Sequence, residues 1–109
     1  MIVRFDALRV ALELVGALRP LIEKLQRLDP KLADQVRRAA VSVVANLAEG
    51  NRRKGRDRTH FFRTSAGSAS EIEGELLGAM ALGYVEEAEI EKPIELEDRI
   101  QAMIYRLTR

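Results

Sequence analysis

Glycine and proline, with their neighbours, predict three breaks between helices in this chain: Asp29-Pro30, residues 50–55 and residues 83–86. In the four long segments between and beyond them, apolar side chains recur every three or four positions. That spacing places them on one face of an α-helix, which must be buried against another element. The sequence therefore predicts an all-α protein, an antiparallel up-down-up-down four-helix bundle that forms a single domain over residues 1–109. The expected helices run from about Asp6 to Leu28, Lys31 to Asn51, Asp57 to Leu82 and Glu87 to Thr108.

Each expected helix has a predicted core stripe. In the first helix the stripe is Leu8, Leu12, Val15, Ile22 and Leu25, with Leu18 beside it. In the second it is Leu32, Val36, Val43 and Leu47, and in the third Phe62, Ala66, Ala69, Ile72, Leu76, Ala79 and Met80. In the fourth it is Ile90, Ile94, Ile100, Ile104 and Leu107.

The helix boundaries and breakers give further expectations. Asp6 should cap the first helix, and Asp57 or Thr59 the third. Pro20 should bend the first helix without ending it, whereas Pro93 either kinks the fourth helix or marks its start. Gly74 and Gly78 lie one turn apart, and they either admit the close approach of another backbone or are tolerated at the surface.

Composition excludes several classes of site. The chain has no cysteine, which excludes disulfides, iron–sulfur clusters, thiolate zinc sites and a cysteine nucleophile. His60 is the single histidine, so a site with several histidine ligands is excluded, and we expect no metal and no cofactor. No apolar run approaches the 18 residues or so of a membrane-spanning helix, and the N-terminus does not resemble a secretory signal. The expected location is the cytoplasm.

The net charge of +1 hides a strong asymmetry. Residues 37–65 carry eight basic and two acidic groups, whereas residues 66–98 carry one basic and ten acidic groups. Residues 99–109 add three basic groups. Charge separation of this kind suggests partners or assembly more readily than an active site.

Antiparallel threading brings the basic residues together. The second loop and both termini fall at one end of the bundle, with Arg4, Arg106 and Arg109, whereas Glu86, Glu87, Glu89 and Glu91 fall at the other end. The planar guanidinium of arginine forms bidentate hydrogen bonds with phosphate oxygens. No aromatic residue lies within the loop to stack on bases. The residues expected to contact nucleic-acid phosphates are Arg52, Arg53, Lys54, Arg56 and Arg58. The alternative is a solvated surface loop in an arginine-rich chain.

Polar residues also share faces on the second and third helices. They are Arg38, Ser42, Asn46 and Glu49 on the second, and Ser68 and Glu71 on the third. Alanines flank both sets, so we interpret them as a structural network between helices or subunits. The alternative is catalysis with Glu49 as a base for Ser42, but these lie two turns, or about 10 Å, apart along the helix. We therefore predict no catalytic residues.

Residues 35–50, followed by Arg53, resemble the signature of the bacterial four-helix-bundle proteins encoded by intervening sequences in 23S ribosomal RNA genes. The second half fits the same family through Phe62, residues 66–69, Glu71, Glu73, Leu76 and residues 82–85. The signature Ser, Asn and Glu of the family correspond to Ser42, Asn46 and Glu49. The chain departs from the family at Pro20 and Pro93 and in a short acidic lead into the fourth helix.

The resemblance implies an antiparallel bundle assembled as a ring-shaped homopentamer, with no established enzymatic activity. The family is similar to the accessory variability determinant proteins of diversity-generating retroelements, basic pentamers that bind nucleic acid and a reverse transcriptase. We therefore expect a non-enzymatic homo-oligomer whose basic end binds RNA or DNA. The alternatives are a protein–protein adaptor, such as an accessory subunit of a reverse transcriptase, and an enzyme acting through Ser42, Asn46 and Glu49.

Overall fold

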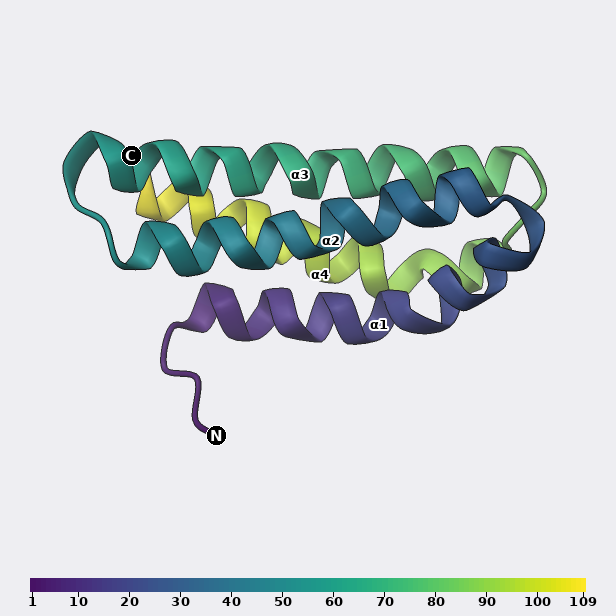
Figure 1. Ribbon diagram of the computed structural model, residues 1–109, viewed down its shortest axis with the longest axis horizontal. Coiled ribbons are helices and arrows are strands. Elements are labelled where there is room, and N and C mark those ends of the chain that lie inside the picture. Colours follow the sequence, from purple (N-terminus) through teal and green to yellow (C-terminus); the bar gives the residue numbers. More distant parts are fainter.

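Four helices make up nearly all of the computed structural model, which describes all 109 residues: α1 (Asp6–Leu28), α2 (Pro30–Asn51), α3 (Gly55–Ala81) and α4 (Glu87–Leu107). The connections are short and alternate between the two ends, so successive helices run in opposite directions (Figure 1). α1 and α3 each pack against both α2 and α4, and the backbones of the diagonal pairs do not approach closely. The predicted all-α, antiparallel four-helix arrangement is thus confirmed. No helix is long and apolar enough to cross a membrane.

The buried face of α1 differs from the predicted one. The side chains that reach the core are Ala7, Val10, Ala11, Leu14, Leu18, Leu21 and Leu25. Leu12 is 44% exposed, and Leu8, Val15 and Ile22 are only half-buried. The helix is apolar over a wide sector, and its contacts with α2 and α4 decide which part of that sector becomes the core.

The helix ends also differ in detail from the sequence expectations. Phe5, not Asp6, is the N-cap of α1, and the Asp6 carboxylate accepts a hydrogen bond from Arg9 within the first turn. Neither Asp57 nor Thr59 caps α3, which begins two residues earlier, at Gly55. Gly55 has a φ of +59°, which lets the chain turn into α3 without side-chain strain.

The two interior prolines are accommodated differently. α1 continues through Pro20, as expected, and this residue is exposed. α4 begins at Glu87, where Glu86 and Glu89 form a reciprocal capping box, so Pro93 lies inside the helix rather than at its start. Pro93 is buried. The other buried side chains of α4 are Ile90, Leu96, Glu97, Ile100 and Ile104, whereas Ile94 is half-buried and Leu107 is 37% exposed.

Small residues set the contact between α2 and α3. A Cβ atom added at Gly50 would lie 2.6 Å from two atoms of the Phe62 ring, so glycine permits the close approach at this end. By contrast, a Cβ at Gly74 or Gly78 would meet nothing within 4 Å, so no other part of the chain approaches there. The predicted stripe of α3 reaches the core except for Ala66 and Met80, which are half-buried, and in α2 Leu32 is half-buried.

Candidate nucleic-acid interface

The α2–α3 connection is a three-residue turn that projects basic side chains into solvent. α2 ends at Asn51, and the backbone N–H groups of Arg52 and Arg53 donate to the carbonyls of Glu49 and Gly50 at 3.0 and 3.1 Å. These bonds tighten the turn and fix the direction in which its side chains leave the bundle. All residues from 51 to 57 are exposed.

The five basic residues predicted for this region have different surroundings. Arg53 is held by carboxylates, with Nε 2.7 Å from Glu49 Oε2 and Nη1 3.6 Å from Asp57 Oδ2, and its guanidinium lies over the Phe61 ring. The hydrogen bond to Glu49 is the main cause of a raised pKa for Arg53. Arg58 lies over the Phe62 ring at 4.8 Å. The other three, Arg52, Lys54 and Arg56, form no ion pair.

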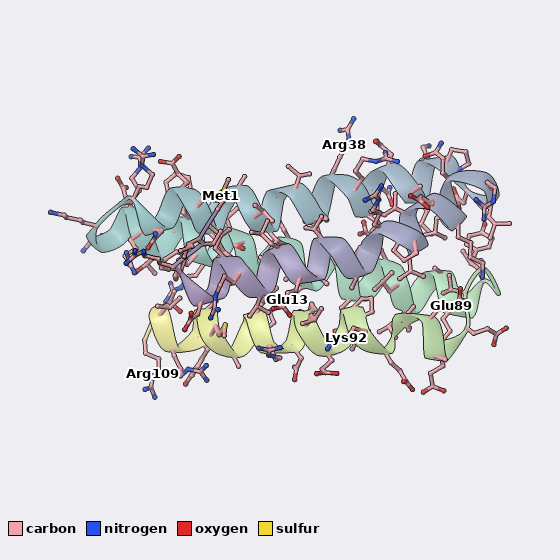
Figure 2. All side chains as sticks on the ribbon, turned by 90° about the horizontal axis from the view of Figure 1, so that it is seen from below. Met1, Glu13, Arg38, Glu89, Lys92 and Arg109 are labelled. Atoms are coloured by element: carbon pink, nitrogen blue, oxygen red, sulfur yellow. The ribbon has the colours of Figure 1, made fainter.

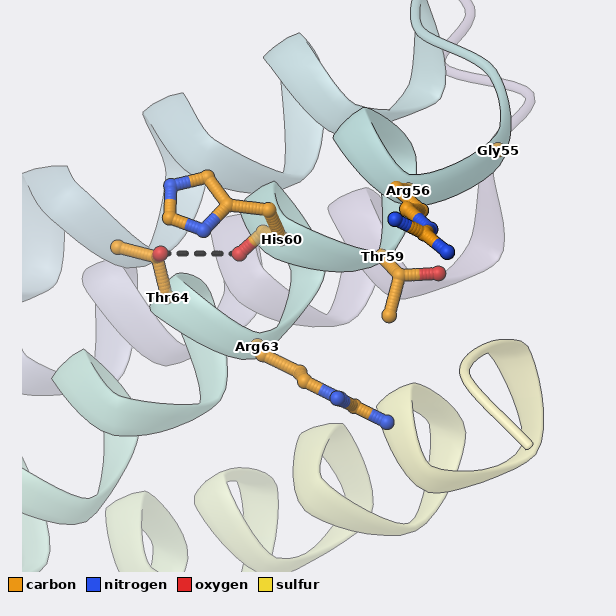
Figure 3. A pocket seen from close by; sticks show the side chains of 6 residues that line it. All are labelled: Gly55, Arg56, Thr59, His60, Arg63 and Thr64. Carbon is orange, nitrogen blue, oxygen red and sulfur yellow. Dashed lines mark hydrogen bonds between the residues drawn. The ribbon is translucent and has the colours of Figure 1, made fainter.

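A polar hollow of about 830 Å³ begins at this turn and follows the first two turns of α3 (Figure 3). No apolar side chain lines it; its residues are Gly55, Arg56, Thr59, His60, Arg63 and Thr64. Thr64 Oγ1 donates to the His60 carbonyl at 2.9 Å. Arg63 was not among the predicted contacts, although its spacing of seven residues from Arg56 puts both on the same side of the helix.

Both chain termini lie at this same end of the bundle (Figure 1). Figure 2 shows Met1 and Arg109 near one end, and Glu89 and Lys92 toward the other. Arg4 and Arg106 line a second hollow there, and the Arg109 guanidinium lies 5.7 Å from the Tyr105 ring centroid. This end, with the α2–α3 turn, the first turns of α3 and both termini, is called the basic end below.

The opposite end is acidic. Glu89 bonds to Lys24 at 3.0 Å and accepts the backbone N–H of Glu86, and these two hydrogen bonds lower the pKa of Glu89. Glu86, Glu87 and Glu91 are exposed and form no ion pair. The separation of charge therefore runs along the length of the bundle.

Three of the six residues predicted for the polar network are joined. Ser42 Oγ and Ser68 Oγ lie 2.7 Å apart, linking α2 to α3, and Asn46 Nδ2 donates to Ser42 Oγ and to the Ser42 carbonyl. The other three form no hydrogen bond with this group: Arg38 pairs with Asp34, Glu49 pairs with Arg53, and Glu71 is exposed. Arg38 and Glu71 nevertheless line the same hollow as Ser42 and Ser68. Ser65, fully buried, adds a second link by donating to the Val43 carbonyl at 2.8 Å.

Two glutamates that sequence reasoning did not single out are held in unusual surroundings. Burial, with repulsion from Glu71, raises the pKa of Glu75 to about 7, and its Oε1 is buried without a hydrogen-bond partner. Glu97 is 2% exposed and accepts from Gln101 Nε2 at 2.8 Å. No sequence pattern marks either residue, because both lie among other acidic residues and only the packing of the helices separates them from water.

The side chains of the catalytic alternative, Ser42 and Glu49, are engaged with other partners. The hydroxyl of Ser42 is engaged by Ser68 and Asn46, while Glu49 is engaged by Arg53, so they do not form a nucleophile–base pair. No group of three histidine, aspartate or glutamate side chains is arranged to hold a metal ion.

Comparisons with known proteins agree with the architecture. No curated protein matches the chain. A crystal structure of a protein of unknown function from the S23 ribosomal protein family of Bacteroides thetaiotaomicron superposes with a TM-score of 0.85 at 19% identity, covering 94% of this chain and 98% of that one. At that identity the likeness shows the shared fold. The model of the 23S rRNA-intervening sequence protein family matches residues 4–106, and the chain therefore belongs to this family.

Proposed function

We propose that this protein is a non-enzymatic homo-oligomer whose basic end binds the phosphate backbone of nucleic acid. The observation that carries the proposal is the convergence of unpaired cations from distant parts of the sequence. Arg52, Lys54 and Arg56 lie at the same end as Arg4 and Arg106, and none of the five is neutralised by a carboxylate of the chain.

The shape of the basic end suits a strand of phosphates. Arg56 and Arg63 line one continuous hollow and are seven residues apart, which is about 10 Å along a helix axis. The N-terminus of α3 adds the partial positive charge of its free N–H groups at the same place. Arg53 and Arg58 lie over the rings of Phe61 and Phe62, which orients their guanidinium groups, whereas Arg52, Lys54 and Arg56 extend into solvent.

Self-association would multiply a weak contact. Several apolar side chains on the sides of the bundle are exposed, among them Leu12, Val41 and Leu77. Copies joined through their sides, with parallel axes, would place all basic ends on one rim. A long polyanion could then engage several copies at once, which raises its apparent affinity without any new contact.

The test is a fluorescence-anisotropy titration of a structured RNA over a range of salt concentrations. The variant Arg52→Ser/Lys54→Ser/Arg56→Ser should bind more weakly and show a flatter log–log salt slope, by up to about 0.9 for each phosphate that is no longer neutralised. The matched control is Arg27→Ser/Lys31→Ser/Lys92→Ser, which removes the same charge away from the basic end. Equal affinities and slopes for the two variants would refute the proposal.

The acidic end favours a second candidate, a protein–protein adaptor for a basic partner such as a reverse transcriptase. Glu86, Glu87 and Glu91 form no ion pair there, and Leu82, at the end of α3, is exposed. A purified partner that binds the wild type but not the variant Glu86→Gln/Glu87→Gln/Glu91→Gln would support this second candidate. Equal binding to both would exclude the acidic end as the docking surface.

A further inference from the structure

A second hollow at the basic end differs in chemistry from the one along α3. It has a volume of about 410 Å³ and lies between the segment that leads into α1 and the last turns of α4. Its lining residues are Arg4, Phe5, Asp6, Ala7, Met103, Arg106 and Leu107. This volume falls within the range of about 300–1,000 Å³ that is typical of small-molecule sites.

The lining combines an apolar wall with two free cations. Phe5 is held in place by Phe62, with ring centroids 5.7 Å apart, and Met103 is half-buried against the core. Arg4 and Arg106 form no ion pair, and both line the hollow. Apolar surface with a few convergent polar groups is the usual composition of a site that holds a flat organic ring and orients its polar substituents.

We propose that this hollow receives one unpaired nucleotide of the bound strand, a refinement that rests on the proposed function above. The base lies against Phe5, Met103 and Leu107, and its phosphate lies between Arg4 and Arg106. Base faces are accessible in this way only when the nucleotide is unstacked, as in single strands and loops. The hollow therefore selects unpaired over fully paired nucleic acid, whereas the α2–α3 turn contacts phosphates of either form.

Asp6 adds a hydrogen-bond acceptor to the same hollow. Its Oδ1 accepts a hydrogen bond from Arg9, which orients the carboxylate. A carboxylate accepts from amino groups of bases or from a ribose 2′-hydroxyl. Asp6 thus lies where it can read the edge of the base or the sugar.

Methyl NMR of methionine tests the site directly, because the chain has only three methionines. With ¹³C-methyl methionine, a single-stranded 12-mer should shift the Met103 resonance and leave Met80, outside both hollows at the basic end, unchanged. A blunt-ended duplex with the same number of phosphates should leave Met103 unmoved, because it presents no unpaired nucleotide. The variant Met103→Leu assigns the signal, because its spectrum lacks that one resonance.

Affinity measurements give an independent readout. Arg4→Ser/Arg106→Ser should weaken single-strand binding by at least about tenfold more than duplex binding, because the two arginines form their charge-assisted hydrogen bonds only when the nucleotide is seated. The control Arg99→Ser/Arg109→Ser removes equal charge outside the hollow and should affect both ligands alike.

Three results would overturn the inference. The first is a Met103 shift of the same size with single strand and duplex, or no shift with either, while Arg52→Ser/Lys54→Ser/Arg56→Ser still weakens binding. In that case the hollow is not the site, and the proposed function stands. The second is a Met103 shift that depends on protein concentration without nucleic acid, which assigns the hollow to another copy of the chain. The third is the absence of nucleic-acid binding at low salt, which removes the proposed function as well.

Discussion

At the scale of single residues, Glu97 links burial to the pH dependence of folding. Burial raises its pKa from an ordinary 4.5 to about 7, and repulsion from Glu73 and Asp98 acts in the same direction, while the hydrogen bond from Gln101 opposes them. Gln101 also donates to the Ala66 carbonyl and to Ser70 Oγ, so the carboxyl group is tied to both α3 and α4. The protonated form is therefore favoured in the folded state.

The sign of the pH effect follows from these values. Because the folded protein holds a proton that the unfolded chain releases near pH 4.5, stability should fall as the pH rises from about 4.5 to about 7 and then level off. Glu97→Gln, which is neutral at every pH, should raise the melting temperature at pH 8 and leave it nearly unchanged at pH 4. The control is Glu95→Gln, an exposed change on the same helix, with melting followed by circular dichroism. An equal gain at both pH values would contradict this explanation.

At the scale of elements, the helices themselves were predictable, whereas the core face of α1 was not. Breaks at Pro30 and residues 50–55 delimit segments whose periodicity is strong, so the order and approximate bounds of all four helices follow from the sequence. α1, however, has apolar side chains over a wide sector, and Leu12 and Leu14 are equally apolar. Only the neighbouring helices distinguish them, because a periodicity defines a face without saying what covers it.

The buried face of α1 can be tested by comparing the free energy of unfolding of two leucine variants. Leu14 is fully buried, so Leu14→Ala should destabilise the fold by about 2–5 kcal/mol through reduced burial and the cavity that remains. Leu12→Ala removes the same atoms from a side chain that is 44% exposed and should cost about 1 kcal/mol or less. Urea unfolding of both variants provides the comparison. A larger destabilisation by Leu12→Ala than by Leu14→Ala would mean that Leu12 is the buried residue, as the sequence predicted, and would contradict the observed packing of α1.

At the scale of the whole molecule, topology could be predicted because short connections leave few ways to thread four helices. The gathering of Arg4, the α2–α3 turn and Arg109 at one end follows from that threading alone. The sequence did not predict which of these basic side chains form ion pairs and which do not. Arg53 is neutralised by Glu49 and Asp57 one turn to either side, and Arg56 is not, a difference that depends on side-chain geometry at the turn.

Assembly is the property of the whole molecule on which multivalent binding would depend. Val41 lies on the side of the bundle, in the middle of α2, and is 59% exposed, so its burial against a second copy would be favourable. Light scattering after nuclease treatment should give a mass several times that of one chain. Val41→Glu should lower that mass while the helical circular dichroism spectrum is kept, because a buried unpaired carboxylate opposes association. Leu82→Glu, at the acidic end, should leave the mass unchanged.

A single-chain mass for the nuclease-treated wild type would exclude self-association. The affinities for long and short RNA should then differ only by the number of binding sites on each strand.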